Sequence, residues 1–190
     1  DIKCKGLNKF NCIYNKCGKN LEQSIRLAMM SFVNKITGYD NCIKHFITPS
    51  EALRKIILDA NIGIQSNKIS TINNFLSEYE LKTIPNFQNK GYFLYVGRLD
   101  IVKGVHYLLQ VIKELPRTIE LHIVGKGTEE SNLKQYAKEN NLTNVKFLGF
   151  KNREEIKEEY QNCIATILPC NWFENFPTTN MESFINGKPV

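Results

Sequence analysis

The sequence predicts an α/β protein whose principal domain is a doubly wound sheet of parallel strands. After residue 91, four apolar runs of strand length alternate with segments of helical spacing, which is typical of a parallel sheet. The first run, Tyr-Phe-Leu-Tyr-Val, is apolar throughout, as expected for a strand covered by helices on both faces. We predict strands at residues 92–96, 119–124, 145–148 and 163–168.

The chain begins with an irregular segment, residues 1–19, that is rich in Cys, Lys, Asn and Gly. Residues 21–39 follow, with apolar side chains at helical spacing along one face. We predict a helix here. Its apolar face packs either against a core or against a partner or membrane surface.

A shorter strand–helix–strand pattern comes next. We predict a strand at residues 42–48, with His45 in its middle as a structural residue, and another strand at residues 68–72. Ser50 is a favourable N-cap, so we expect a helix from residue 51 to about residue 60.

The pattern then breaks over a polar stretch with Pro, Asn and Gly, as a linker would. We therefore divide the chain into a first domain at residues 1–75, a linker at residues 76–91 and a second domain at residues 92–190. The predicted helices between the strands of the second domain span residues 104–115, residues 128–140 with Thr128 as the cap, and residues 152–160, where Asn152 and Glu155 match a capping box.

Composition narrows the classes of partner. The formal net charge is +6, and Lys residues are scattered along the chain. These charges either form a solvated surface or attract an anionic partner such as a phosphate ligand or an acidic membrane surface. No motif of interleaved aromatic and basic residues occurs, so we expect no nucleic-acid partner. No apolar run reaches the length of a membrane span. Because the chain starts at Asp1 and stops at Val190, we expect it to be cut at both ends.

Three of the six cysteines, Cys4, Cys12 and Cys17, lie close together near the start of the chain. Their spacing is looser than that of zinc-binding Cys pairs, and a zinc site would need a fourth ligand. We keep them as candidate zinc ligands beside the alternative that they are free thiols. Cys163 is expected to open a strand as a small residue of the core.

Candidate binding residues follow the ends of the predicted strands. Parallel strands present their carboxyl ends at one edge of the sheet, where ligands of doubly wound sheets bind. Arg98 and Lys103 follow the first strand, and Glu174 follows the fourth. Two cations, glycine turns and a helix N-terminus together predict a diphosphate site. The glycines of these turns are Gly97, Gly125, Gly127 and Gly149.

Two carboxylates, Glu174 and Glu182, are separated by seven residues after the fourth strand. Glu174 lies in the predicted loop, and Glu182 lies about one turn into the following helix. Carboxylate lone pairs suit sugar hydroxyl groups, so we expect each to bind a different part of one polar ligand. The further candidates between them are Asn175, Phe176, Pro177, Thr178 and Thr179.

Other phosphate and sugar chemistries fit less well. Residues 125–128 read Gly-Lys-Gly-Thr, but Lys126 is not followed by the Ser or Thr that a P-loop requires. Glu130 stands where the third glycine of a dinucleotide-binding motif belongs. A glycosidase would use two carboxylates but would not explain Arg98 or Lys103.

A set of motifs resembles, in order, the C-terminal domain of family-4 glycosyltransferases of the GT-B fold, the glycosyl transferases group 1. The resemblance covers residues 92–190. Residues 42–75 resemble the end of the N-terminal domain of the same family. The Cys-containing start resembles an insertion of one bacterial and archaeal subgroup. It implies two Rossmann-like doubly wound domains, both incomplete in this chain. The motifs are Phe93-Leu-Tyr-Val-Gly-Arg-Leu with Lys103-Gly104, Ile123-Val-Gly-Lys-Gly127, Asn144-Val-Lys-Phe-Leu-Gly149, Glu174-(x7)-Glu182 and Gly187-Lys-Pro-Val190.

The resemblance implies a role for each candidate. Arg98 and Lys103 match residues that hold the diphosphate of a nucleotide-sugar donor. Glu174 matches the carboxylate that binds the transferred sugar, and Glu182 matches the carboxylate that binds the nucleotide ribose. Backbone N–H groups of residues 176–179 would meet the sugar or the phosphates.

On this resemblance the protein is a retaining, hexosyltransferase-type enzyme that moves a sugar from a nucleotide-diphosphate sugar to a saccharide or lipid-linked acceptor. Arg98, Lys103 and Glu174 are the expected catalytic residues. Pro177 departs from the more common glycine and removes one backbone donor. No Asp-x-Asp motif occurs, so we expect no cofactor and no divalent metal, with the cations in that role.

The resemblance also implies a cytoplasmic location, a peripheral contact with the membrane face, and a place in the synthesis of cell-surface polysaccharide or glycolipid. We expect the fragment itself to be inactive. The alternative is a non-catalytic module that binds a nucleotide sugar, and a Rossmann-type oxidoreductase is less favoured.

Overall fold

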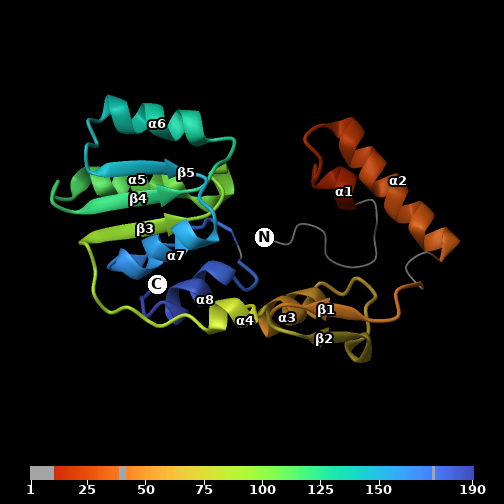
Figure 1. The fold of residues 1–190 in the computed structure, drawn as a ribbon. Helices are drawn as coiled ribbons and strands as arrows, with labels where there is room; N and C mark the ends of the chain where they lie inside the picture. Colours follow the sequence, from red (N-terminus) through yellow and green to blue (C-terminus); the bar gives the residue numbers. More distant parts are fainter. Residues whose placement is uncertain (1–10, 39–41, 173) are drawn as a thin grey trace. The chain divides into compact units, whose positions relative to one another are not determined.

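The computed structural model describes residues 11–38, 42–172 and 174–190 (Figure 1). The chain divides into two compact units, Asp1–Asn74 and Phe75–Val190. The candidate binding residues from Gly97 to Glu182 all belong to the second unit.

The first unit contains the predicted long helix, which carries an exposed apolar face. The short helix α1 spans Asn11–Tyr14, and α2 spans Leu21–Thr37. Asn20 caps α2 through its side chain, and Gly38 ends it with φ 67°. Most large apolar side chains of α2 are exposed, among them Leu21, Met29, Met30, Phe32, Val33 and Ile36.

A small parallel sheet follows in the same unit, and its strands are shorter than predicted. Strand β1 spans Phe46–Thr48 and pairs with β2, which spans Ile69–Thr71. His45 is therefore not in mid-strand as predicted; it precedes β1 and is exposed, with Nε2 2.7 Å from the hydroxyl of Ser70. The predicted cap is confirmed, because Ser50 accepts the N–H of Leu53 at the start of α3. That helix spans Glu51–Asp59, and a 3-10 turn spans Ser66–Lys68.

The stretch predicted as a linker is folded and hydrogen-bonded to the end of the chain. It contains the short helix α4, Glu78–Leu81, which begins with a capping box formed by Ser77 and Glu80. The N–H of Asn86 donates to the carbonyl of Asn186 at 3.2 Å. The buried ammonium group of Lys188 donates to the carbonyl of Gln88 at 2.5 Å. These bonds attach residues 76–91 to the second unit.

The second unit is built on a parallel sheet in the order β5-β4-β3-β6, as the fold class predicts. The chain adds strands outward on one side of β3 and then returns to its other side, so β3 and β6 flank the point where the winding reverses. The strands span Tyr92–Val96 (β3), Glu120–Val124 (β4), Val145–Gly149 (β5) and Ala165–Thr166 (β6).

Strand β6 is shorter than the predicted run of residues 163–168. Cys163 does not open the strand; it caps the preceding helix, and its N–H donates to the carbonyl of Glu159. Cys163 is fully buried, however, so its predicted place in the core is confirmed. The N–H groups of Ile164 and Ile167 donate to β3, and Pro169 interrupts the run soon after them.

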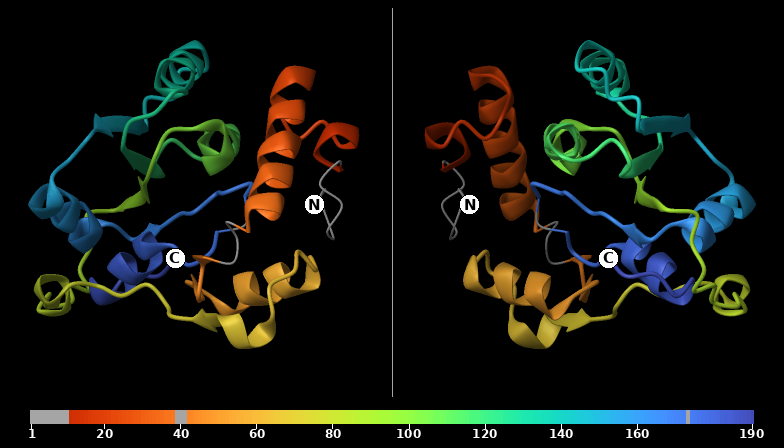
Figure 2. Two further views of the ribbon diagram at one scale, coloured as in Figure 1. Left: turned by 90° about the vertical axis from the view of Figure 1, so that its right-hand side faces the viewer. Right: turned by 90° about the vertical axis from the view of Figure 1, so that its left-hand side faces the viewer.

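Helices cover both faces of the sheet (Figure 2). Helices α5 and α6 cover one face, and α7 and α8 cover the other. They span Val105–Glu114 (α5), Arg153–Asn162 (α7), Glu130–Glu139 (α6) and Thr178–Ile185 (α8), and a 3-10 turn at Ile101–Lys103 precedes α5.

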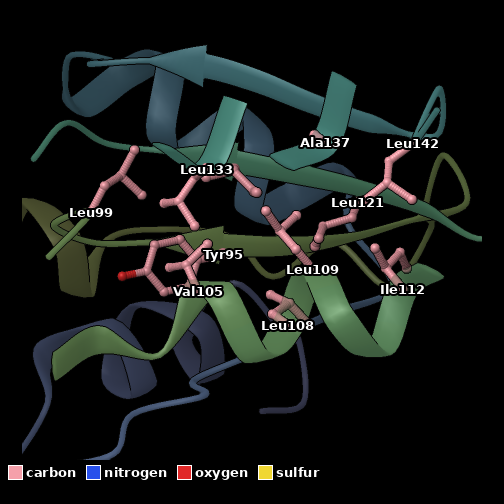
Figure 3. Close-up of a cluster of buried hydrophobic side chains, with 11 residues drawn as sticks. Tyr95, Leu99, Val105, Leu108, Leu109, Ile112, Leu121, Leu133, Ala137 and Leu142 are labelled. Atoms are coloured by element: carbon pink, nitrogen blue, oxygen red, sulfur yellow. The ribbon is translucent and has the colours of Figure 1, made fainter. Parts of the chain in front are cut away.

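Each face of the sheet has its own apolar cluster. On the larger one, side chains of α5 and α6 such as Leu109 and Leu133 meet Tyr95 and Leu121 of the strands (Figure 3). On the opposite face Tyr160 of α7 packs with strand residues of opposite parity. Alternate residues of β3 therefore serve two cores, which explains why this strand is apolar throughout.

The two predicted caps of the second unit differ in outcome. Asn152 and Glu155 form the predicted capping box at the start of α7. Thr128 does not cap α6 as predicted; the cap position is Glu129, and it makes no side-chain cap bond. The N–H and hydroxyl of Thr128 both lie 3.3 Å from Oδ1 of Asp100, so a contact with another loop replaces the local cap.

The loops at the carboxyl edge of the sheet are held together by their backbones. The N–H of Gly97 donates to Val124, and the N–H of Gly125 donates to Gly149, at 3.0 and 2.8 Å. Gly125 has φ 139°, and a Cβ there would lie 1.9 Å from the carbonyl oxygen of Gly97. Only glycine allows this approach of the loops that follow β3 and β4.

We expect Gly125→Ala to lower the free energy of unfolding by about 3 kcal/mol or more, because the cost of backbone strain and the cost of the overlap with Gly97 are summed. Gly149→Ala is the matched control. Its φ is 69°, but a Cβ there meets nothing within 4 Å, so only the left-handed backbone cost of about 1–2 kcal/mol applies. Urea unfolding of both variants measures the difference, and equal losses would contradict it.

A second prediction concerns Glu159, which lies within hydrogen-bond distance of Lys151 and His122. Burial alone would raise the pKa of Glu159, but the hydrogen bonds from Lys151 and His122 outweigh burial and lower it from 4.5. A carboxyl group whose pKa is lower in the folded than in the unfolded protein stabilises the fold at pH values above the unfolded pKa. This stabilisation is lost as the pH falls through the folded pKa.

We therefore expect Glu159→Gln to destabilise the protein by about 1–3 kcal/mol at pH 7, and the difference from wild type to shrink below about pH 4.5. Glu158→Gln is the control, because Glu158 is 72% exposed and lies 3.8 Å from an exposed lysine. Urea unfolding at pH 7 and pH 4 provides the measurement. A pH-independent loss would show that charge plays no part.

Candidate functional site

The candidate site lies where the loops after β3 and β6 meet, at the carboxyl edge of the sheet. The N–H of Asn171 donates to the carbonyl of Val102 at 3.2 Å. Gly104 has φ 71°, and a Cβ there would lie 2.0 Å from the carbonyl oxygen of Pro169. The two loops are thus in direct backbone contact, and each carries side chains predicted for the site.

Lys103 and Glu174 are brought together by this contact. The ammonium nitrogen of Lys103 lies 2.5 Å from Oε1 of Glu174, and each side chain is 22% exposed. The thiol of Cys170 donates to the same oxygen at 3.1 Å. A cation, a thiol and a carboxylate therefore form one cluster at the point where the winding of the sheet reverses.

The cluster keeps Glu174 ionised. Burial by itself would raise the pKa of Glu174, but the hydrogen bonds from Lys103 and Cys170 and the charges of Lys103 and Arg98 lower it. Burial and the neighbouring Glu174 raise the pKa of the Cys170 thiol to about 11. Near neutral pH the cluster thus contains a carboxylate acceptor beside a protonated thiol.

Arg98 lies near this cluster but has a carboxylate of its own. Its guanidinium group is 2.8 Å from Oδ2 of Asp100 and is 72% exposed. The carbonyl oxygen of Arg98 accepts the hydroxyl of the buried Tyr95 at 2.7 Å, which holds the backbone in place. Asp100 and Cys170 are residues that sequence reasoning missed. The position of Asp100, two residues after Arg98, is a signal that could have identified it. No spacing pattern in the sequence identifies Cys170.

Glu182 has different surroundings from Glu174. It lies on α8, and its Oε2 accepts the hydroxyl of Tyr160 at 2.8 Å. Burial and the charge of Glu182 raise the pKa of Tyr160, so the phenol remains a donor. Tyr160 is also a residue that the sequence analysis missed.

Two hollows lie beside these residues. Glu182 and Tyr160 line a cavity of about 150 Å³ between α4, α7 and α8. A shallower hollow of about 290 Å³ lies over the ends of β3 and β4, and Ile156 borders both. Besides Glu182 and Tyr160, the polar side chains that line the first cavity are those of Glu80, Thr83, Arg153, Lys157 and Asn186. The residues that line the second hollow include Gly97, Arg98, Gly125, Lys126, Phe150 and Lys151.

The remaining predicted residues lie at the start of α8. Pro177 occupies the cap position of this helix and makes no side-chain cap bond. Asn175 and Thr178 are exposed, and Phe176 and Thr179 are half-buried. Of the predicted glycines, Gly97 and Gly125 already donate their N–H groups to the backbone, and a Cβ at Gly127 would overlap Leu99. These glycines join loops to one another.

The predicted zinc ligands fall only partly within the structure. Cys12 is half-buried and Cys17 is exposed, and the N–H of Cys17 donates to the carbonyl of Cys12 at 3.1 Å. Cys4 lies outside the described residues. Within the described residues no three His, Cys, Asp or Glu side chains are grouped as a metal site requires, so this zinc site stays a prediction.

No helix in the described part of the chain is both long and apolar enough to span a membrane.

The chain is similar to known glycosyltransferases over most of its length. It is 25% identical over 174 residues to an uncharacterized glycosyltransferase of Methanocaldococcus jannaschii, covering 82% of this chain and 43% of that protein. It is 25% identical over 164 residues to the lipopolysaccharide 1,6-galactosyltransferase of Escherichia coli K12, covering 82% and 44%. The chain thus spans less than half the length of these curated relatives.

Solved structures give the same result for the fold. The apo form of the lipopolysaccharide outer core galactosyltransferase WaaB superposes with a TM-score of 0.63 at 26% identity, over 77% of this chain and 42% of that chain. Anabaena HepE in complex with UDP-glucose superposes with a TM-score of 0.65 at 24% identity, over 77% and 44%. These neighbours confirm the predicted GT-B fold class.

The family is shown by a direct match. The family model described as glycosyl transferases group 1 matches residues 78–190, which is more than half of the chain. The matched region begins with α4 and includes every predicted binding residue from Gly97 to Glu182. The narrower assignment to family 4 stays a prediction. The parallel sheet, the order of its motifs and this match lead to one conclusion: the chain belongs to the glycosyl transferases group 1.

Proposed function

We propose that the protein transfers a sugar from a nucleotide-diphosphate sugar to a saccharide or lipid-linked acceptor, with retention of the anomeric configuration. The observation that carries this proposal is the contact between Lys103 and Glu174 where the winding of the sheet reverses. A sugar joined to a diphosphate presents hydroxyl groups beside an anionic leaving group. A carboxylate beside an ammonium group matches that arrangement.

Each part of the donor has a proposed partner. Lys103 and Arg98 bind the diphosphate, Glu174 binds hydroxyls of the transferred sugar, and Glu182 binds the nucleotide ribose. The first turn of α8 supports this assignment, because its cap position is a proline without a side-chain cap bond and leaves helix N–H groups for an anion.

In the proposed reaction the bond between the anomeric carbon and the diphosphate oxygen breaks, and the oxygen keeps the electron pair. The acceptor hydroxyl forms the new bond to that carbon and gives its proton to the departing diphosphate. Lys103 and Arg98 stabilise the negative charge that grows on the leaving group, where each positioned donor is worth about 10²–10³ in rate. They take the role that a divalent metal has in other transferases, and no cofactor is proposed.

The names of similar proteins support a role in glycan synthesis. One relative is a lipopolysaccharide galactosyltransferase of E. coli, and another is an E. coli O-antigen chain mannosyltransferase, 30% identical over 101 residues. HepE was solved with UDP-glucose. We therefore propose a hexose donor and an acceptor in cell-surface polysaccharide or glycolipid synthesis, and a cytoplasmic enzyme that meets lipid-linked acceptors at the membrane face.

We expect Arg98→Ala, Lys103→Ala and Glu174→Ala in the intact protein each to reduce transfer at least about a hundredfold, because each removes a contact to the donor. The measurement is sugar transfer from the nucleotide sugar that raises the melting temperature of wild type most. Lys113→Ala is the control; Lys113 is an exposed lysine in the last turn of α5 and should leave transfer unchanged.

Full activity in any of the three site variants would contradict the assignment of that residue. A wild-type protein that binds a nucleotide sugar but transfers none would favour the non-catalytic module. A protein whose melting temperature responds to no nucleotide sugar would reject both.

Glu182 is tested through Tyr160, which holds it. We expect Tyr160→Phe to weaken binding of the nucleoside diphosphate alone about three- to tenfold, because Glu182 loses a charge-assisted hydrogen bond. Tyr136→Phe, a half-buried tyrosine of α6, is the matched control and should bind as wild type does. Isothermal titration measures both, and equal affinities for all three proteins would argue against a ribose role for Glu182.

A further inference from the structure

We propose that Cys170 is a positioning residue that holds Glu174 through Oε1, so that Oε2 is presented to the transferred sugar. This inference rests on the proposed function, because the sugar role of Glu174 is part of it. The reacting atoms do not meet Cys170 in this scheme; it acts through Glu174.

The first argument is the pattern of contacts on the carboxylate. Lys103 and Cys170 both approach Oε1, at 2.5 and 3.1 Å. Within the described residues no hydrogen bond reaches Oε2 of Glu174. Two donors on one oxygen fix the orientation of the carboxylate and leave the other oxygen with its lone pairs for hydroxyl groups.

The second argument is the rigidity of the support. Cys170 stands between two backbone anchors, because the carbonyl of Pro169 packs on Gly104 and the N–H of Asn171 donates to Val102. Its backbone is therefore held against the loop that carries Lys103. A donor on such a fixed support can hold a reacting group within the narrow tolerance that a catalytic site requires.

The third argument is the chemistry of the thiol. Burial and the hydrogen bond to Glu174 raise the pKa of Cys170 to about 11, so the group remains S–H at neutral pH. A thiolate would repel the carboxylate, whereas the thiol donates to it. The same shift makes Cys170 a poor nucleophile, which fits a holding role and does not fit covalent catalysis.

The thiol has a task that Lys103 cannot perform alone. In the proposed reaction the ammonium group of Lys103 must also serve the diphosphate, and it then divides its donors between two anions. Cys170 makes no contact with the diphosphate in this scheme. It therefore keeps Glu174 in place when Lys103 turns toward the leaving group.

The test compares Cys170→Ala, which removes the donor, with Cys170→Ser, which keeps a donor of similar size. In the intact protein we expect Cys170→Ala to lower kcat/KM for the donor about three- to tenfold and Cys170→Ser to stay within about twofold of wild type. Loss of a donor raises the pKa of Glu174, so the acid limb of the pH profile should move to higher pH in Cys170→Ala only. Cys42→Ala, an exposed cysteine of the first unit, is the control and should match wild type.

Wild-type kinetics in Cys170→Ala, or an equal loss in Cys170→Ser with an unmoved acid limb, would overturn the positioning role. A second measurement needs no nucleotide sugar. The rate of alkylation of Cys170 against pH, followed by mass spectrometry, should show a lower thiol pKa in Glu174→Gln than in wild type. Unchanged titration overturns the contact itself, whereas a shifted titration without transfer by wild type rejects the proposed function, and with it the sugar role of Glu174, but leaves the contact in place.

Discussion

The close approach of Gly104 to the carbonyl of Pro169 is the constraint on which the arrangement of the site depends. A Cβ at residue 104 would lie 2.0 Å from that oxygen, so the loops after β3 and β6 can meet only where a glycine stands. The neighbouring bond from Asn171 to Val102 extends the contact. Lys103 and Cys170 lie between these points, and for that reason both reach the same oxygen of Glu174.

The two carboxylates of the motif are held by different means. Glu174 stands in a loop and is fixed by a cation and a thiol, both on Oε1. Glu182 stands on a helix and is fixed by the phenol of Tyr160, which is 1% exposed, on Oε2. In both cases one oxygen is bonded within the protein while the donor side chain is itself held by packing or by backbone contacts. Such support orients a charged group before a ligand arrives.

The sheet and its helices were predictable because their signals are local and periodic. An apolar run such as residues 92–96 and a capping box such as Asn152 with Glu155 depend on nearby residues alone. The cluster at the site was only partly predictable, since topology brings strand ends to one edge but does not pair side chains. Lys103 and Glu174 are 71 positions apart, and their contact depends on the meeting of two loops.

The incorrect predictions about Thr128 and strand β6 have the same physical origin as the unpredicted contact between Lys103 and Glu174. Thr128 has the chemistry of a helix cap, but its hydroxyl and N–H lie against Asp100 of another loop. Strand β6 has an apolar run longer than its ladder, because the preceding helix continues to Asn162 and Cys163 completes it. In each case a contact that competes with the local signal decides the structure, and that competitor cannot be identified from neighbouring residues.

The pairing of cations with carboxylates determines how an anionic donor can enter. Arg98 faces Asp100 and Lys103 faces Glu174, so these four side chains have no net charge before binding. Arg98 is 72% exposed, and its ion pair is screened by water, so exchanging Asp100 for a phosphate costs little. Lys103 is 22% exposed, and its pair with Glu174 is less screened.

On the proposed function, a diphosphate therefore meets Arg98 readily, and it engages Lys103 fully only when sugar hydroxyls compensate Glu174. Binding of the phosphate and of the sugar would then be coupled through a single contact, which favours an intact donor over a nucleotide that has lost its sugar.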